Sequence, residues 1–226
     1  MSIKNRPLSI LFKIIIIIII ATGIILQFSA NNYDWHLFNY FTILSNILCL
    51  LYLLNSVTYM FKCNDIRVTT FNPLWRGFGL TALTLTCLIA NILLGNQFDF
   101  TNLKGISLFI LHIITPALFI LDWLLFDTKG RFIVSYPLIW TLFPLGYLLY
   151  IYVGVKIMGS LALGSVYPYP FMDVDKIGVS NFIITMLVMI VGFLIMSYLY
   201  FILDYKLDFR EEIKQPKHYR KHKKRT

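Results

Sequence analysis

Residues 105–126 read GISLFILHIITPALFILDWLLF, a run of 22 residues in which only His112 and Asp122 carry ionisable side chains. A helix needs roughly 20 mostly apolar residues to cross the hydrocarbon of a bilayer, so this run is long enough to span a membrane. Ionisable side chains are costly in hydrocarbon and usually face a protein interior or a water-filled cavity. The run therefore predicts a transmembrane helix and makes His112 a candidate functional residue.

Five further apolar runs of similar length accompany this one. The six predicted spans cover residues 8–28, 38–61, 75–94, 105–126, 133–152 and 181–203. Hydrophobic residues make up 58% of the chain and charged residues only 14%, whereas a soluble domain carries roughly 25% charge. The runs are continuous rather than alternating, which excludes the pattern of a membrane β-barrel. We therefore expect an all-α, polytopic membrane protein with six transmembrane helices.

Lysine and arginine are distributed unequally between the two sides of these spans. Of the 20 basic residues, 17 fall on the side that holds both termini, and only Lys104, Lys156 and Lys176 fall on the other. Cytoplasmic segments carry the excess of basic residues, so both termini are expected to be cytoplasmic. The basic flank of the first span resembles that of a signal peptide, but its apolar run continues to residue 28, and we expect it to be retained.

The chain is expected to divide into a six-helix transmembrane domain, residues 1–205, and a basic cytoplasmic tail, residues 206–226. The tail is expected to be disordered and attracted to anionic lipid. The net charge of +9 follows from the topology and the tail. It does not indicate binding to nucleic acid.

Polar residues follow one face of three neighbouring predicted spans. They are Asn39, Thr42, Ser45, Asn46 and Cys49 in the second span, Thr84, Cys87 and Asn91 in the third, and His112, Thr115 and Asp122 in the fourth. Spacings of three, four and seven residues place side chains on one side of a helix. Such stripes often do no more than join helices by hydrogen bonds.

The depth of these residues favours a pocket. With a rise of 1.5 Å per residue, Thr42, His112 and Asn46 lie about 6, 10 and 12 Å below the outer boundary of the membrane. Asn91 lies near the outer end of its span. Four polar side chains from three helices therefore share one layer of the outer leaflet, which predicts a polar pocket there.

Asp122 and Arg76 lie at matching depths near the cytoplasmic ends of their spans. Pairing would offset the cost of burying each charge, so the two residues predict a structural ion pair. An alternative is that Asp122 orients His112. Ten residues of helix separate these two side chains by about 15 Å, which favours the ion pair.

The segment before the sixth span, residues 167–171, reads YPYPF. Its prolines predict an extended, stiff backbone, and its aromatic side chains Tyr167, Tyr169 and Phe171 suit a membrane interface. Two interpretations stay open: an interfacial anchor, or a lid over the predicted pocket.

Several segments resemble, in order and spacing, a bacterial family of small six-span integral membrane proteins. They are residues 40–46 (YFTILSN), 112–116 (HIITP), 121–126 (LDWLLF), 136–137 (YP) and 167–173 (YPYPFMD). The resemblance covers nearly the whole chain except the tail. It implies a multi-pass protein of the bacterial cytoplasmic membrane.

More distantly, the same segments are similar to the eukaryotic androgen-induced gene family of membrane hydrolases. That similarity implies cleavage of fatty acid esters of hydroxy fatty acids by a threonine nucleophile and a histidine, which would be Thr42 and His112. The family's acidic residue ten positions after the histidine would match Asp122. Its Tyr-Pro-Phe followed by an acidic residue would match 169–171 and Asp173.

The hypothesis is therefore a membrane hydrolase of lipid (fatty acyl) esters, with Thr42 as nucleophile and His112 as base. The substrate would contact Ser45, Asn46, Asn91, Tyr167, Tyr169 and Phe171, with Asn46 or Asn91 donating to the oxyanion. No cofactor is expected. A metal site is not expected either, because His36 and His112 are the only histidines on the predicted outer side.

Two other functions remain open. The chain could bind or move a lipid or a small apolar molecule without catalysis, in which case His112 would serve as a hydrogen-bonding or protonation site. It could also be a structural subunit of a larger membrane complex, in which case Thr42 and His112 would tolerate replacement.

Overall fold

The computed structural model describes residues 3–65, 69–93, 95 and 98–214. Six of its helical segments are long and apolar enough to cross a membrane, and the part of the chain described contains no strand, so the prediction of an all-α protein with six spans is confirmed. The spans are α1 (Arg6–Ala30), α2 (Phe41–Lys62), α3 (Pro73–Leu88) with the π-helix η2 (Ile89–Leu93), α4 (Leu103–Phe109) with η3 (Ile110–Ile114) and α5 (Thr115–Phe126), α6 (Tyr136–Met158), and α8 (Val179–Lys214). Shorter helices are η1 (Trp35–Asn39), η4 (Pro170–Met172) and α7 (Val174–Ile177).

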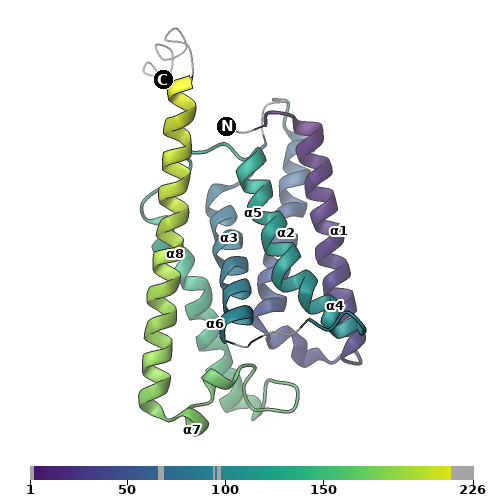
Figure 1. The fold of residues 1–226 in the computed structure, drawn as a ribbon, viewed down its shortest axis with the longest axis vertical. Coiled ribbons are helices and arrows are strands. Elements are labelled where there is room, and N and C mark those ends of the chain that lie inside the picture. Colours follow the sequence, from purple (N-terminus) through teal and green to yellow (C-terminus); the bar gives the residue numbers. More distant parts are fainter. Residues whose placement is uncertain (1–2, 66–68, 94, 96–97, 215–226) are drawn as a thin grey trace.

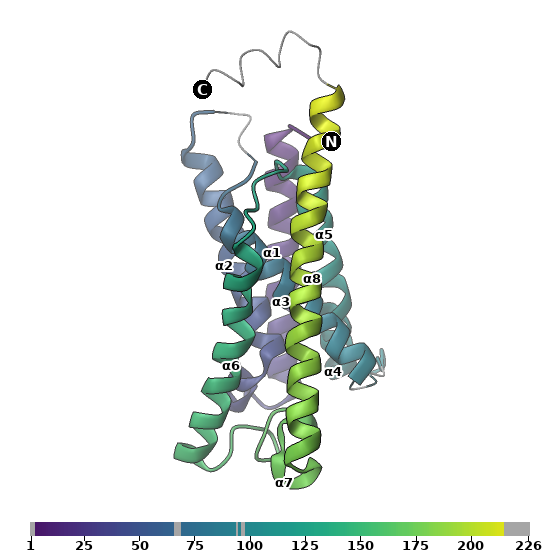
Figure 2. The ribbon, with the colours of Figure 1, turned by 90° about the vertical axis from the view of Figure 1, so that its left-hand side faces the viewer.

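The helices form an elongated bundle in which α1 begins and α8 ends at the same end (Figure 1). We call this the terminal end and the opposite one the far end. Helix α3 is central, since it contacts α2, α5, α6 and α8. Helices α6 and α8 pack against each other, while α1 packs against α2 and against the α4–η3–α5 segment (Figure 2).

Helix α8 is longer than the sixth predicted span. It continues to Lys214 and extends beyond the other helices at the terminal end (Figure 1). Residues 206–214, expected to begin a disordered tail, are therefore helical. The rest of the predicted tail, 215–226, lies outside the described residues.

The contact between α3 and α6 depends on a glycine. The indole of Trp140 is fully buried, and its Nε1 donates to the carbonyl oxygen of Leu74 at 3.0 Å. A Cβ atom at Gly77 would lie 1.8 Å from Cζ2 of this ring. The absence of a side chain at Gly77 thus lets a tryptophan lie directly against the backbone of the central helix.

We expect Gly77→Ala to destabilise the fold by about 1–3 kcal/mol, because a rigid indole must move to make room for the methyl group. The measurement is unfolding in mixed micelles titrated with SDS. Gly192→Ala in α8 is the matched control: nothing lies within 4 Å of its Cβ position, and replacing a helical glycine with alanine gains up to about 1 kcal/mol. Equal effects of the two substitutions would contradict this account.

The fourth span is not a uniform α-helix. Pro116, the second residue of α5, has no N–H, and in a regular α-helix its ring would clash with the carbonyl of His112 four residues earlier. The preceding N–H, that of Thr115, bonds instead to the carbonyl oxygen of Ile110, five residues back. The result is the π-helix η3, a feature that is frequent at functional sites, and His112 lies within it.

Candidate functional site

Thr42, near the start of α2, contacts His112 of η3 at the far end of the bundle. Thr42 Oγ1 lies 3.0 Å from His112 Nε2, and His112 Nδ1 lies 2.9 Å from the carbonyl oxygen of Leu108. A carbonyl oxygen only accepts, so Nδ1 carries the ring proton and Nε2 is left as the acceptor. The Thr42 hydroxyl therefore donates its proton to Nε2. The structure thus brings together the two residues proposed as nucleophile and base.

Two buried residues hold the backbone of Thr42 in place. Its carbonyl oxygen accepts from Ser45 Oγ at 3.0 Å and from Asn46 Nδ2 at 2.8 Å. The Ser45 hydroxyl also pairs with Thr86 Oγ1 of α3 at 2.8 Å, and Asn46 Nδ2 also donates to the carbonyl oxygen of Leu111 at 3.3 Å. Ser45 and Asn46 therefore join α2 to α3 and η3 behind Thr42.

This arrangement corrects the expected role of Asn46. Its side chain is fully buried, and its amide donates to two backbone carbonyls rather than into a pocket. Neither Ser45 nor Asn46 lines the pockets next to Thr42. Both residues support the backbone of Thr42 from behind the pockets.

Asn91 was wrongly expected to face the same pocket. Its side chain is exposed and donates to the carbonyl oxygen of Cys87 in its own helix at 2.7 Å. The residue lies in η2, where the wider π-helical turn breaks the α-helical spacing used to place it. Its neighbours Ile89 and Ala90 line the pocket instead.

Two pockets meet at Thr42 and His112. The inner pocket, about 50 Å³ in volume, lies among α2, α3, α6 and α8 and is mostly apolar, with Met172, Met186 and Met189 in its wall. The outer pocket, about 300 Å³, has a more polar wall that includes Gln27, Asn31 and Lys104. Three residues line both pockets: Thr42, His112 and Tyr169.

The loop between α6 and α7 covers these pockets. It is tied to the bundle by Asn39 Nδ2, which donates to the carbonyl oxygen of Leu161 at 2.9 Å, and by Tyr152 Oη, which donates to that of Met172 at 2.6 Å. Tyr169 stacks on Phe171 with ring centroids 5.3 Å apart, and both side chains line the inner pocket. Residues of this loop therefore form part of the wall of both pockets.

Tyr167 lies elsewhere in the same loop. Its ring packs against Tyr152, with centroids 5.4 Å apart, and it lines neither pocket. The structure therefore does not bring Tyr167 to the pockets beside Thr42. Side chains two positions apart share a face only where an extended backbone is regular. This segment turns into a 3₁₀ helix at Pro170, so Tyr167 and Tyr169 do not face the same surroundings.

Tyr169 is the buried phenol of the site, with 8% of its surface exposed. Its hydroxyl lies near the Thr42 side chain and the backbone amides of Phe41 and Thr42. Burial raises the pKa of this phenol to about 12, although those interactions favour its ionised form. At neutral pH Tyr169 is therefore protonated and able to donate a hydrogen bond.

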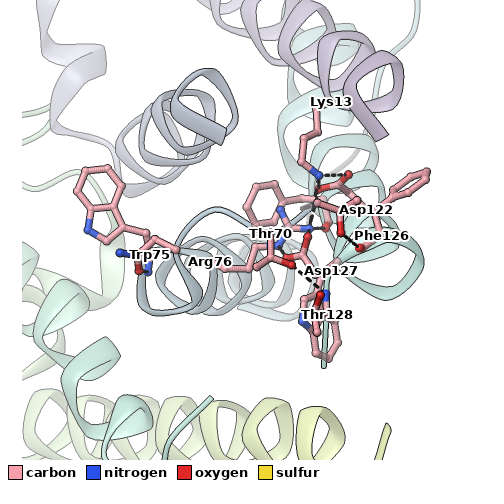
Figure 3. A network of polar contacts seen from close by, with 12 residues as sticks. Lys13, Thr70, Trp75, Arg76, Asp122, Phe126, Asp127 and Thr128 are labelled. Atoms are coloured by element: carbon pink, nitrogen blue, oxygen red, sulfur yellow. Dashed lines mark hydrogen bonds and ion pairs between the residues drawn. The ribbon is translucent and has the colours of Figure 1, made fainter. Parts of the chain in front are cut away.

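A second polar cluster lies toward the terminal end, between α1, α3 and α5 (Figure 3). The predicted ion pair is present: Arg76 Nη2 lies 2.8 Å from Asp122 Oδ2. Lys13 Nζ lies 2.7 Å from Asp122 Oδ1, and Arg76 Nε lies 3.1 Å from Asp127 Oδ2. All four side chains are buried. Since Asp122 binds two cations here and His112 Nδ1 binds a carbonyl, Asp122 does not orient the histidine.

Lys13 and Asp127 are the members of this cluster that the sequence analysis missed. Lys13 lies within the apolar run of the first predicted span, where a charge needs a partner, and this position was the signal for it. Asp127 directly follows α5, and burial raises the pKa of its carboxyl while Arg76 and Lys13 oppose that rise. Asp122 is the carboxylate that both cations contact most closely, since Lys13 Nζ lies 4.0 Å from Asp127 Oδ1 but 2.7 Å from Asp122 Oδ1.

The described residues contain no group of three or more His, Cys, Asp or Glu side chains arranged to hold a metal ion. Comparison of the chain with models of protein families, with curated proteins and with solved structures gives no match.

Proposed function

We propose that this protein is an integral membrane hydrolase of lipid (fatty acyl) esters, with Thr42 as nucleophile and His112 as base. The observation that carries the proposal is the 3.0 Å contact between Thr42 Oγ1 and His112 Nε2, with Nδ1 held by the Leu108 carbonyl. A hydroxyl is a weak nucleophile unless an adjacent base takes its proton. An imidazole held in the correct tautomer is suited to that task near neutral pH.

The reaction would proceed in two acyl transfers. Thr42 Oγ1 attacks the ester carbonyl while its proton passes to His112 Nε2, giving a tetrahedral oxyanion. Its collapse breaks the bond to the alcohol, which leaves with the proton from Nε2. Water then attacks the acyl-threonine, again losing a proton to Nε2, and the fatty acid departs as Thr42 regains its hydrogen.

The two pockets suit the two parts of such a substrate. The apolar inner pocket would take the acyl chain, and its three methionines, being flexible, can rearrange to admit a longer chain. The more polar outer pocket would hold the alcohol portion and supply water. With the terminal end in the cytoplasm, as the basic residues favour, the site would lie in the outer leaflet of a bacterial cytoplasmic membrane.

A non-enzymatic function is the second candidate, and one observation favours it. The partner of His112 Nδ1 is the Leu108 carbonyl and not a carboxylate, and Asp122 is bound by Lys13 and Arg76. A neutral carbonyl partner stabilises the imidazolium less than a carboxylate does. The same pockets could then bind or move a lipid or a small apolar molecule, with His112 as a hydrogen-bonding group.

Covalent labelling separates the two functions. We expect a fluorophosphonate bearing an alkyl chain to form a stable adduct with the purified protein in detergent, and mass spectrometry of the digest to locate the phosphonate on Thr42. His112→Gln should prevent labelling, since the hydroxyl then lacks a base. Thr58→Val is the matched control: Thr58 lies on the same helix, is exposed, and donates only to the Leu54 carbonyl at 2.8 Å.

Labelling of Thr42 that depends on His112, together with hydrolysis of a panel of fatty acyl esters, would support the hydrolase. A protein that binds the ester lipids but shows neither turnover nor labelling would favour the binding function. A label found on a different residue, with turnover intact in Thr42→Val, would exclude Thr42 as the nucleophile.

A further inference from the structure

The hydrogen bonds around Thr42 have a definite direction. His112 Nδ1 must donate to the Leu108 carbonyl, so Nε2 must accept from Thr42. Having used its only proton, the Thr42 oxygen can only accept from Tyr169. The Tyr169 hydroxyl lies near this oxygen, and the amides of Phe41 and Thr42 lie near the same hydroxyl. The phenol proton is thus directed at the atom that would attack a substrate.

We propose that the hydroxyl of Tyr169, which lines both pockets beside Thr42 and His112, is the oxyanion donor of the ester hydrolase. This inference rests on the proposed function. After attack, the carbonyl oxygen of the substrate is bonded to the same carbon as Thr42 Oγ1 and so lies within reach of the Tyr169 phenol, which already approaches Oγ1. The phenol would turn its proton from Oγ1 to the oxyanion as negative charge develops there.

The start of α2 offers two backbone amides that orient the phenol of Tyr169. The first N–H groups of a helix have no partner within it, and Tyr40 at the N-cap offers no side-chain cap. The amides of Ile43 and Leu44 bond to the Tyr40 carbonyl at 3.0 and 3.2 Å. Those of Phe41 and Thr42 approach the Tyr169 hydroxyl instead.

The position of Tyr169 is also the one that an oxyanion donor requires. Like Thr42 and His112, Tyr169 lines both pockets. It therefore lies where the acyl and alcohol portions of an ester would join. It is held by stacking on Phe171 and by an edge contact with Tyr40 at 5.9 Å between centroids. A donor fixed in advance needs little reorganisation during the reaction.

The test compares the parent with Tyr169→Phe, which removes one oxygen and keeps the aromatic stack. We expect kcat to fall about 100- to 1,000-fold with KM nearly unchanged, because the bond is made in the transition state and not in the ground state. An alkyl trifluoromethyl ketone supplies a second readout. Thr42 would add to its carbonyl to give a bound oxyanion, so Tyr169→Phe should weaken this inhibitor by a similar factor while leaving KM alone.

Tyr167→Phe is the matched control, since Tyr167 belongs to the same loop and lines neither pocket. It should leave kcat and inhibitor affinity unchanged. An active parent beside a folded Tyr169→Phe variant with unchanged kcat and inhibitor affinity would overturn the role of Tyr169 alone. A parent with no ester turnover and no affinity for the ketone would overturn the proposed function and this inference with it.

Discussion

Replacing Asp122 with asparagine is expected to destabilise the folded protein by about 3–5 kcal/mol, because it removes the carboxylate that lies nearest to two buried cations. Asp122 accepts from Lys13 at 2.7 and 2.8 Å and from Arg76 at 2.8 Å, and all three side chains are fully buried. Asparagine has nearly the same shape, so the packing of α1, α3 and α5 would change little. The loss of stability would therefore come from the missing charge and not from a cavity.

Unfolding in mixed micelles titrated with SDS measures this effect. The informative control is the double variant Lys13→Met with Asp122→Asn, which removes one charge of each sign. Arg76 keeps Asp127 as a partner, with Nε 3.1 Å from Oδ2, so the double variant should be more stable than Asp122→Asn alone. A double variant as unstable as the sum of the two single ones would show that Lys13 and Asp122 are not coupled.

The cluster shows what depth along a sequence can and cannot predict. Arg76 and Asp122 were paired correctly because they sit at matching depths on spans that neighbour each other in the chain. Lys13 also lies at that depth, but it belongs to the first span. Nothing in the order of the spans indicates that α1 packs against α5. That contact depends on the packing of the whole bundle.

The candidate catalytic pair could be predicted for a similar reason, with support from the family resemblance. Thr42 and His112 share a depth, and the structure places them in contact at 3.0 Å. Asn91 shares that depth too and faces outward. Depth is set by the rise of 1.5 Å per residue, but the direction of a side chain depends on the helical turn. The π-helices at η2 and η3 change that turn.

The sequence predicted that the aromatic segment 167–171 lies near the pocket, but not that Tyr169 is the residue beside Thr42. The YPYPF segment indicated a stiff aromatic cover, yet the sequence alone did not separate Tyr169, which lines both pockets, from Tyr167, which lines neither. The separation arises from contacts with α6, where Tyr152 packs against Tyr167 and bonds to the carbonyl of Met172. Such contacts join residues far apart in the chain, and the sequence of one segment does not predict them.

Ester turnover in variants of Thr42 and His112 is expected to show the largest effect on activity. Thr42→Val and His112→Gln should each lower kcat/KM by about 100- to 10,000-fold, the range that a positioned base supplies. The two residues act as one unit, since the histidine serves only to move the proton of the threonine. The double variant should therefore be no slower than the slower single variant.

Non-additivity distinguishes the dyad from two independent binding residues. If Thr42 and His112 merely contacted the substrate through separate hydrogen bonds, their losses would multiply and would appear largely in KM. Thr58→Val, on the exposed side of the same helix, should retain full turnover. Losses that multiply in the double variant would contradict a Thr–His dyad, because the histidine would then be acting on the reaction without the threonine.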